Sequence, residues 1–259
     1  MSAQLTISKL DIQIAERMLV QNLELDIETG EFVCILGTNG VGKTLTLHTL
    51  AGLREGRTQS VRVGGEPLDA LPRKELAKRL GLLLQIQEDA FPQTVLDTAL
   101  MGLYPHLKHW QWPGREEYAC AHHALQVFDL AGLESRSVMT LSGGERERLA
   151  LATLQVQNPL IWLLDEPMNH LDPHHQHTVM EHLKSVSKTG RIVISTMHNP
   201  NHALHYADKV LMLYGQGEWE YGPAAELLQP SRLERIYQTP FTFYQSNAED
   251  GKRTLLAPR

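Results

Sequence analysis

The sequence predicts an α/β fold with a mostly parallel sheet, an antiparallel β subdomain and an inserted α-helical subdomain. Three observations predict it. The first thirty residues alternate apolar and polar side chains, as half-exposed antiparallel strands do. Five short, continuous apolar runs follow, which is typical of strands buried on both faces of a parallel sheet. About seventy residues with a helical pattern separate two of these runs.

The strands are predicted in chain order from these apolar positions. The antiparallel strands carry apolar residues at every second position, namely Leu5 and Ile7, then Leu10, Ile12 and Ile14, then Leu23, Leu25 and Ile27. The buried parallel strands are predicted at residues 32–36, 80–84, 160–164, 192–195 and 210–213. The stretches between the later strands are helical in pattern, as α/β units require.

The inserted helical subdomain is predicted at about residues 86–157. Its helices are indicated by the spacing of Ala119, His123, Leu125, Val127 and Phe128. We expect one domain over residues 1–240. The tail at 241–259 is polar and is expected to be only partly ordered.

Composition narrows the class of protein. Hydrophobic residues make up 42% of the chain and charged residues 21%, which is ordinary for a globular protein. Thirty acidic against 24 basic residues give a net charge of -6, the wrong sign for binding a phosphate backbone. Cys34 and Cys120 lack metal-ligand spacing, the N-terminus lacks signal-peptide features, and no apolar run is long enough to span a bilayer. We therefore expect a reducing cytoplasm, and a membrane role only through a partner.

The segment GTNGVGKT at residues 37–44 matches the phosphate-binding pattern G-x-x-x-x-G-K-[ST]. It follows a predicted apolar strand and precedes a predicted helix, which is the required context. The backbone N–H groups of such a loop close around phosphates, Lys43 reaches the β- and γ-phosphates, and the Thr44 hydroxyl ligates Mg²⁺. The motif predicts a P-loop NTPase core that binds Mg-ATP through Gly37, Thr38, Asn39, Gly40, Val41, Gly42, Lys43 and Thr44.

A second element is the apolar strand that ends in Asp165 and Glu166. A carboxylate at a strand tip beside the P-loop is placed to hold Mg²⁺ through water, which is the role predicted for Asp165. Glu166 lies one residue beyond and is predicted to polarise the attacking water. The alternative is a solvated acidic turn, which the P-loop in the same chain disfavours.

A third element is the glycine-rich turn that comprises Leu141, Ser142, Gly143, Gly144 and Glu145, which opens a helical run and so forms a second anion site. It resembles the signature motif of ABC ATPases. The resemblance covers nearly the whole chain, and the motifs come in the family's order. They are the P-loop, Gln85 at a strand end, the signature, Asp165 with Glu166, the D-loop-like run Asn169 to Asp172, and His198.

The resemblance implies roles for these residues. Gln85 would contact Mg²⁺ next to the transmembrane partner, Asp172 would belong to the ATP site, and His198 would touch the γ-phosphate. In the family, the signature of one chain covers the ATP held by the P-loop of another. Ser142, Gly143, Gly144 and Glu145 are therefore expected to act across a homodimer interface.

Looser matches point to a subgroup. ALMGLYPHL after Gln85, LERIYQTPF and LLAPR near the end resemble the ATPases of importers for iron-siderophores, haem and cobalamin. This implies two transmembrane permease subunits, a periplasmic substrate-binding protein that acts through them, and a peripheral place on the cytoplasmic face of the inner membrane. No nucleic-acid partner is expected. An exporter or lipid transporter stays open, and a soluble ABC protein acting on nucleic acid or ribosomes is disfavoured by the single P-loop and the charge.

Three residues depart from the family pattern. Ile14 stands where the family usually stacks an aromatic side chain on adenine, Leu45 where it commonly has Thr, and Glu145 where it has Gln. The histidines at 122–123 and 174–177 sit at positions that point apart on a helix, so we expect no metal site there. Trp110 and Trp112 are expected to be packing or interface residues.

Overall fold

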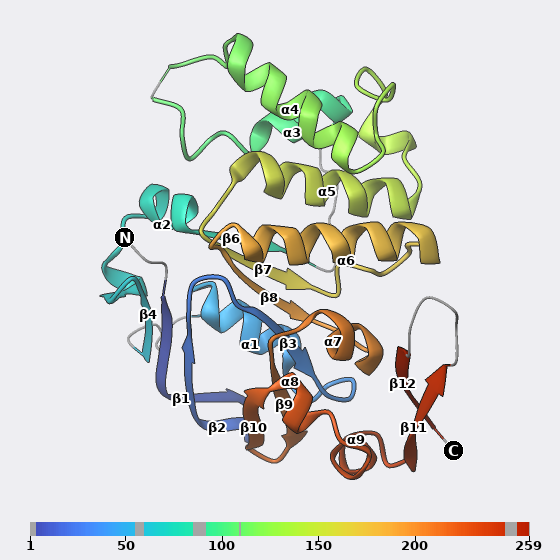
Figure 1. Ribbon diagram of the computed structural model, residues 1–259. Coiled ribbons are helices and arrows are strands. Elements are labelled where there is room, and N and C mark those ends of the chain that lie inside the picture. The colour runs from blue at the N-terminus through green and yellow to red at the C-terminus, as the bar shows by residue number, and fades with distance from the viewer. Residues whose placement is uncertain (1–3, 55–59, 85–91, 109, 247–252, 259) are drawn as a thin grey trace.

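A computed structural model describes residues 4–54, 60–84, 92–108, 110–246 and 253–258 of the chain. At its centre is a six-stranded sheet with the strand order β10-β9-β3-β8-β7-β6 (Figure 1). Its strands are β3 (Phe32–Leu36), β6 (Leu80–Leu83), β7 (Ile161–Asp165), β8 (Ile192–Thr196), β9 (Lys209–Gly215) and β10 (Glu218–Pro223). The first five pair in parallel and β10 is antiparallel at the edge. The predicted parallel core is confirmed.

The strands of this sheet are apolar along their length because both faces are covered. In β3, Val33 and Ile35 pack with helix α1 (Lys43–Leu50) and the N-terminal strands. The alternate residues Phe32, Cys34 and Leu36 face a second cluster, which the other helices complete. Trp162 of β7 is fully buried in that second cluster, and its indole N–H donates to the Pro159 carbonyl at 3.1 Å.

The N-terminal strands form a separate antiparallel sheet of order β2-β1-β4-β5. They are β1 (Leu5–Ile14), β2 (Arg17–Ile27), β4 (Val61–Val63) and β5 (Glu66–Pro67). The β1–β2 hairpin turns at Ala15, whose φ is 48°, and so brings Ile14 opposite Arg17. The apolar alternation predicted this sheet because its inward-facing residues are buried and its outward-facing residues are not.

Helices α3 (Val95–Met101), α4 (Arg115–Val127) and α5 (Gly143–Gln157) pack together above the sheet in the view of Figure 1. The predicted helix around Ala119 to Val127 is confirmed by α4, which buries Ala121, Ala124 and Leu125. Thr94 caps α3 and Ser142 caps α5, each by accepting a backbone N–H. These caps fix where the two helices begin.

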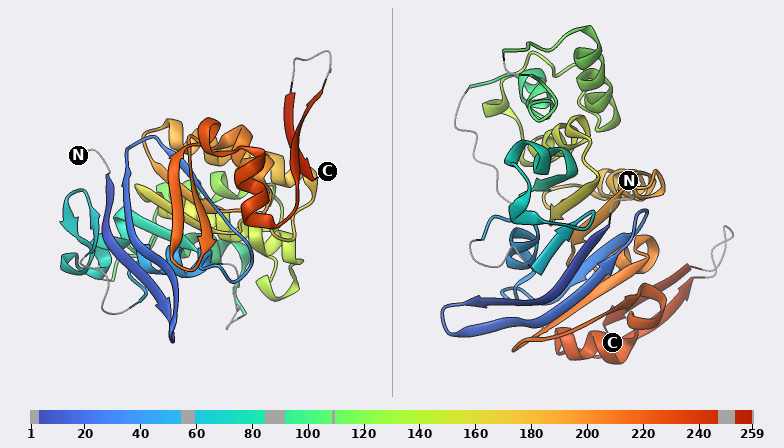
Figure 2. Two further views of the ribbon diagram at one scale, coloured as in Figure 1. Left: turned by 90° about the horizontal axis from the view of Figure 1, so that it is seen from below. Right: turned by 90° about the vertical axis from the view of Figure 1, so that its left-hand side faces the viewer.

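The remaining helices are α2 (Arg73–Arg79), α6 (Pro173–Lys188), α7 (Pro200–Tyr206), α8 (Ala224–Leu227) and α9 (Pro230–Tyr237). The tail contains an antiparallel ribbon of β11 (Phe241–Ser246) and β12 (Arg253–Pro258), which stands at one edge of the molecule (Figure 2). Phe241 and Leu256 anchor this ribbon because both side chains are buried in the same apolar cluster as Trp162. The described helices include none with the length and apolarity needed to cross a membrane.

Candidate functional site

The glycine-rich loop at residues 37–44 joins β3 to α1, as the sequence predicts. A Cβ on Gly37 would lie 2.7 Å from Val41 Cγ1 and 2.9 Å from the Leu213 carbonyl oxygen, so no larger residue fits there. Gly42 has a φ of 114° and is the N-cap of α1, a conformation that L side chains rarely adopt. The loop therefore brings its backbone close to the helix N-terminus, where N–H groups can bind an anion.

Lys43 lies inside this loop. Its ammonium donates to the carbonyl oxygens of Gly37 at 3.0 Å and Thr38 at 3.2 Å, and the residue is only 5% exposed. Burial lowers the pKa of Lys43, while the nearby carboxylates of Glu166 and Asp165 oppose that shift. The loop thus holds one cation directly beside two acids.

Asp165 is the last residue of β7 and is fully buried. Its Oδ1 accepts the Thr196 hydroxyl at 2.7 Å, whereas its Oδ2 has no hydrogen-bond partner among the described residues. Buried carboxylate oxygens nearly always have a partner. The unsatisfied oxygen therefore fits a ligand that carries positive charge or donates protons, such as a hydrated cation.

Glu166 follows in a left-handed conformation with a φ of 52°. Its backbone N–H donates to the Thr196 hydroxyl oxygen at 2.8 Å. Asn169 Nδ2 donates to Glu166 Oε2 at 2.9 Å, and His198 Nε2 lies 2.5 Å from Oε1. Both carboxylate oxygens are therefore held in place by neighbouring side chains.

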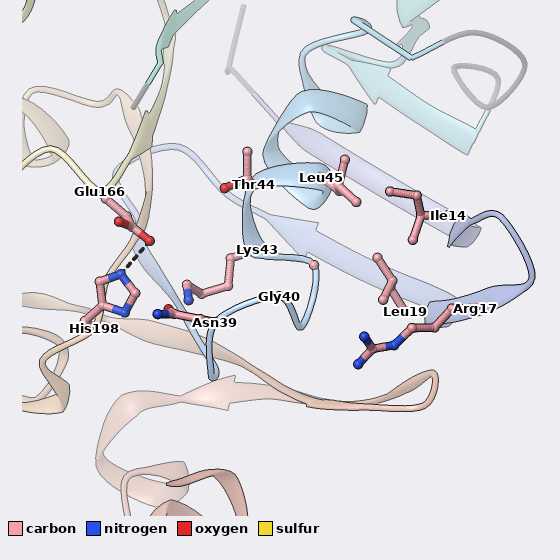
Figure 3. Close-up of a pocket in the computed structure, with 11 residues that line it drawn as sticks. Ile14, Arg17, Leu19, Asn39, Gly40, Lys43, Thr44, Leu45, Glu166 and His198 are labelled. Atoms are coloured by element: carbon pink, nitrogen blue, oxygen red, sulfur yellow. Dashed lines mark ion pairs between the residues drawn. The ribbon is translucent and has the colours of Figure 1, made fainter. Parts of the chain in front are cut away.

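A cavity of about 400 Å³ runs from the glycine-rich loop to the β1–β2 hairpin (Figure 3). The predicted site residues that line it are Asn39, Gly40, Gly42, Lys43, Thr44, Glu166 and His198. The hairpin end is lined by Ile14, Arg17, Leu19 and Leu45, with no aromatic side chain among the described lining residues. Arg17 and Leu19 were not predicted as site residues, because only the turn at Ala15 brings them to the loop. Gln85 lies outside the described residues.

Thr196 and Asn169 also were not predicted as site residues. Thr196 ends β8, and its hydroxyl joins the side chain of Asp165 to the backbone of Glu166. The pairing of β7 with β8 places Thr196 opposite Asp165. β7 and β8 are consecutive strands that lie side by side in the sheet, but their apolar patterns did not specify the register that sets the Thr196 hydroxyl beside Asp165.

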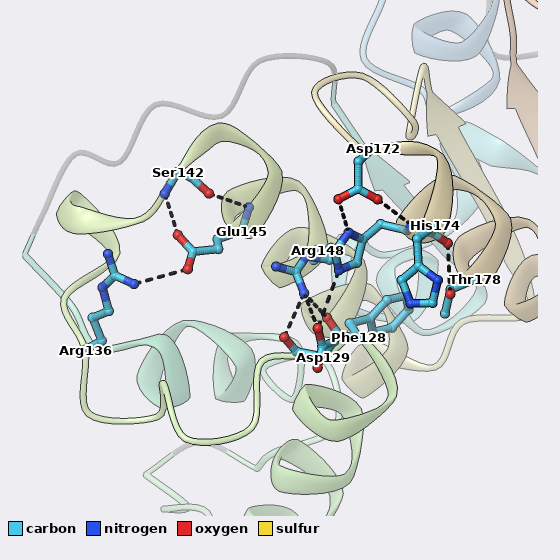
Figure 4. Close-up of polar contacts among 10 residues, drawn as sticks. Phe128, Asp129, Arg136, Ser142, Glu145, Arg148, Asp172, His174 and Thr178 are labelled. Atoms are coloured by element: carbon cyan, nitrogen blue, oxygen red, sulfur yellow. Dashed lines mark hydrogen bonds and ion pairs between the residues drawn. The ribbon is translucent and has the colours of Figure 1, made fainter.

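The signature residues lie elsewhere. Ser142 is the N-cap of α5, where its hydroxyl accepts the Glu145 N–H at 3.2 Å and its own N–H donates to Glu145 Oε2 at 2.7 Å (Figure 4). The Ser142 N–H lowers the pKa of Glu145, and Arg136 lies 3.1 Å from its other oxygen. Glu145 thus completes a capping box in this chain. Of the described residues that line the 400 Å³ cavity, none belongs to the turn at 142–145.

Asp172 is the N-cap of α6 and accepts from His175 at both the backbone N–H, 3.0 Å, and Nδ1, 2.8 Å. The opposite nitrogen of His175 lies 3.5 Å from Asp129, which also pairs with Arg148 of α5. Asp172, like the signature, does not line the cavity in the part of the chain that the structure describes.

An apolar groove of about 570 Å³ lies on the helical side of the molecule. Trp110 and Trp112, which are 87% and 86% exposed, stand on it. We call it the aromatic groove, and its apolar lining is Leu100, Met101, Tyr104, Leu107, Trp110, Trp112, Pro113 and Tyr118. Exposed aromatic clusters of this kind mark interaction surfaces.

Comparison with known proteins agrees with this geometry. The family model described as ABC transporter matches residues 20–169. The hemin import ATP-binding protein HmuV of Burkholderia ambifaria is 30% identical over 98% of this chain and 99% of its own. The petrobactin import ATP-binding protein FpuC of Bacillus anthracis is 31% identical over 94% and 90%. A solved structure described as a metal-chelate type ABC transporter in an inward-facing conformation superposes with a TM-score of 0.86, at 26% identity over 99% and 98% of the two chains.

Proposed function

The chain belongs to the ABC transporter ATP-binding family, and we propose that it binds and hydrolyses ATP to energise a metal-chelate importer. The chelate would be of the iron-siderophore, haem or cobalamin type, taken up through partner permease subunits. The relatives that import hemin and petrobactin support this class of substrate. One observation carries the catalytic part: the glycine-rich loop and the doubly held Glu166 carboxylate line a single cavity.

Within that cavity, the loop at 37–44 would bind the phosphates of ATP through its N–H groups and the Lys43 ammonium. On nucleotide binding, the Lys43 ammonium would give up its hydrogen bonds to the Gly37 and Thr38 carbonyls and would donate to phosphate oxygens instead. Glu166 would accept a hydrogen bond from the attacking water, since a fixed carboxylate can orient and polarise it. His198, which already contacts Glu166, would reach the γ-phosphate.

We propose Mg²⁺ as the companion of ATP. Thr44 and Gln85 would hold it directly, and Asp165 would hold it through water. The buried Oδ2 of Asp165, which has no hydrogen-bond partner among the described residues, supports this assignment. Bound there, the ion would offset negative charge on the β- and γ-phosphates.

Replacing Glu166 by Gln tests the catalytic assignment. Glu166→Gln should bind ATP but hydrolyse it at least about a hundredfold more slowly, within the range for loss of a general base. Nucleotide trapping by the purified transporter measures ATP binding, and the steady-state assay measures the rate of hydrolysis. Hydrolysis close to the wild-type rate would remove Glu166 from this role.

The division of the chain stays our proposal as well. It comprises one ATPase domain over 1–240 with a helical insertion at about 86–157 and a tail at 241–259. The signature residues Ser142, Gly143, Gly144 and Glu145, together with Asp172, would complete the ATP site of a second copy. Their position away from the 400 Å³ cavity of their own chain supports a homodimer.

A mixing experiment tests the shared site. Chains with Lys43→Ala and chains with Ser142→Arg are each expected to be inactive. A mixture can form one interface with an intact loop and an intact signature, so mixing should restore part of the hydrolysis. No recovery from folded, dimerising mutants would contradict the homodimer model.

Membrane permease subunits are the partners of this family of ATPases. We propose that two of them dock at the cytoplasmic face of the inner membrane, one on the aromatic groove of each copy of the chain. The two exposed indoles and the apolar floor support this choice. A periplasmic substrate-binding protein would deliver the chelate on the opposite face. Uptake by reconstituted vesicles should then require ATP inside and that binding protein outside, and export of the chelate would contradict the importer assignment.

A further inference from the structure

The C-terminal segment, which comprises helix α9 and the tail ribbon, contacts the loop that carries His198 and the start of helix α7. That loop is short: β8 ends at Thr196 and the N-cap of α7 is Asn199, so only Met197 and His198 lie between them. The His198 imidazole faces Glu166 and the 400 Å³ cavity. Its backbone faces helix α9, because the hydroxyl of Tyr237 at the end of that helix donates to the His198 carbonyl oxygen at 3.2 Å. A single residue thus joins the nucleotide cavity to the C-terminal segment.

A second contact lies three residues further on. The Leu256 backbone N–H donates to Asn201 Oδ1 at 2.7 Å, and Asn201 Nδ2 donates to the Leu256 carbonyl at 2.9 Å. The Asn201 amide therefore pairs with β12 through two bonds, much as a neighbouring strand would. The Leu256 side chain is only 2% exposed and is buried in the same apolar cluster as Trp162. The strand β12 is therefore anchored by its own buried side chain as well as by these hydrogen bonds.

Tyr237 itself is fixed. It is the last residue of α9, and its ring packs on Phe241 with 5.6 Å between ring centroids. Burial raises the pKa of Tyr237 to about 12, so the phenol keeps its proton and stays a donor at neutral pH. A groove of about 350 Å³ separates the remaining parts of tail and loop, and His198, Asn199 and Pro258 are among its lining residues. The hydrogen bonds, rather than close packing throughout, connect tail and loop.

We propose that the C-terminal segment positions His198: Tyr237 holds the His198 backbone, the Asn201–Leu256 pair holds the start of α7 directly after the loop, and together they set the distance between the imidazole and the Glu166 carboxylate. Tyr237 and Asn201 act through His198 and are positioning residues. The proposal rests on the catalytic function assigned above to Glu166 and His198.

Tyr237→Phe tests this in the assembled transporter, because it removes only the hydroxyl. We expect kcat for ATP hydrolysis to fall about three- to tenfold, the range for one lost hydrogen bond. KM for ATP should change less than twofold, since most of the proposed phosphate contacts lie on the loop at 37–44. Tyr221→Phe is the matched control: Tyr221 lies in β10, and its hydroxyl also donates to a backbone carbonyl, at 3.3 Å, but to that of Asp26 in β2 of the N-terminal sheet and not to the His198 loop.

The decisive readout is the same substitution in a His198→Ala background. If Tyr237 acts through the imidazole, Tyr237→Phe should have no further effect on kcat there. Asn201→Ala is a second variant, which removes both hydrogen bonds to Leu256. It should also lower kcat in the wild-type background and have no further effect in the His198→Ala background. Wild-type kcat in Tyr237→Phe, or an equal loss with and without His198, would overturn the proposal. Wild-type hydrolysis by His198→Ala and Glu166→Gln would instead overturn the proposed function itself.

Discussion

Thr196 offers a sharp test of how the site is held together, because one hydroxyl joins two acids. It donates to Asp165 Oδ1 at 2.7 Å and accepts the Glu166 N–H at 2.8 Å, and Thr196 is fully buried. Thr196→Val keeps the shape of the side chain but leaves both groups without this partner. Each buried group left unsatisfied costs about 1–3 kcal/mol. We therefore expect the free energy of unfolding to fall by about 2–6 kcal/mol.

The same substitution should slow hydrolysis. Glu166 has a left-handed backbone, a conformation that persists only where neighbours hold it. Without the bond to Thr196, the Glu166 carboxylate should move, and a displacement of about 1 Å can cost on the order of a hundredfold in rate. Urea unfolding and steady-state ATP hydrolysis measure the two effects. Thr196→Ser keeps the hydroxyl and should stay within about 1.5 kcal/mol of wild type, since it loses one methyl group. Wild-type stability and rate in Thr196→Val would refute the reasoning.

Three further predictions concern other parts of the chain. GTP should compete measurably with ATP, and Ile14→Tyr should restore stacking worth about 1–3 kcal/mol for ATP without changing tripolyphosphate affinity; a strong ATP preference of the wild type in competition titrations would contradict this. Burial raises the pKa of Glu147 to about 8, so the folded state keeps a proton that the unfolded state loses above pH 4.5, and stability should fall by up to about 1.4 kcal/mol per pH unit until about pH 8. Glu147→Gln should lack this slope, and equal slopes in unfolding titrations at pH 5 to 8 would count against it. Gln85→Ala should leave ATP affinity nearly intact but lower uptake per ATP hydrolysed in vesicles; an unchanged ratio would remove its coupling role.

Most of the fold could be predicted because buried positions are occupied by apolar residues, and their spacing differs between strands and helices. The five parallel strands were predicted to within two residues at each end, since both of their faces are covered by other elements. The antiparallel strands β1 and β2 and the α4 helix followed from their apolar spacing. The tail was less predictable. Its ribbon depends on the burial of Phe241 and Leu256 in a core that distant segments form. Two apolar residues in a polar stretch do not predict such burial.

The position of the glycine-rich loop was predictable because one continuous segment makes it. The loop needs only local geometry, so its sequence pattern was enough to place it between β3 and α1. The contacts of Thr196 with Asp165, and of His198 with Glu166, join the ends of adjacent parallel strands and the loop beyond. The apolar pattern of a strand does not specify its register with the neighbouring strand or the path of the loop beyond it. The polar network around the two acids therefore required the structure.

The placement of the tryptophans gives the protein an optical reporter of its own. Trp162 is sealed in the core and Trp219 is partly buried, with its indole N–H donating to the Gln21 carbonyl at 2.8 Å, whereas Trp110 and Trp112 are exposed to water on the aromatic groove. Indole emission moves to shorter wavelength when its surroundings become apolar. Covering the groove would therefore shift mainly the long-wavelength part of the spectrum, while the part from Trp162 and Trp219 would change when the chain unfolds. Intrinsic tryptophan fluorescence could thus follow assembly and denaturation separately in one sample, without an attached dye.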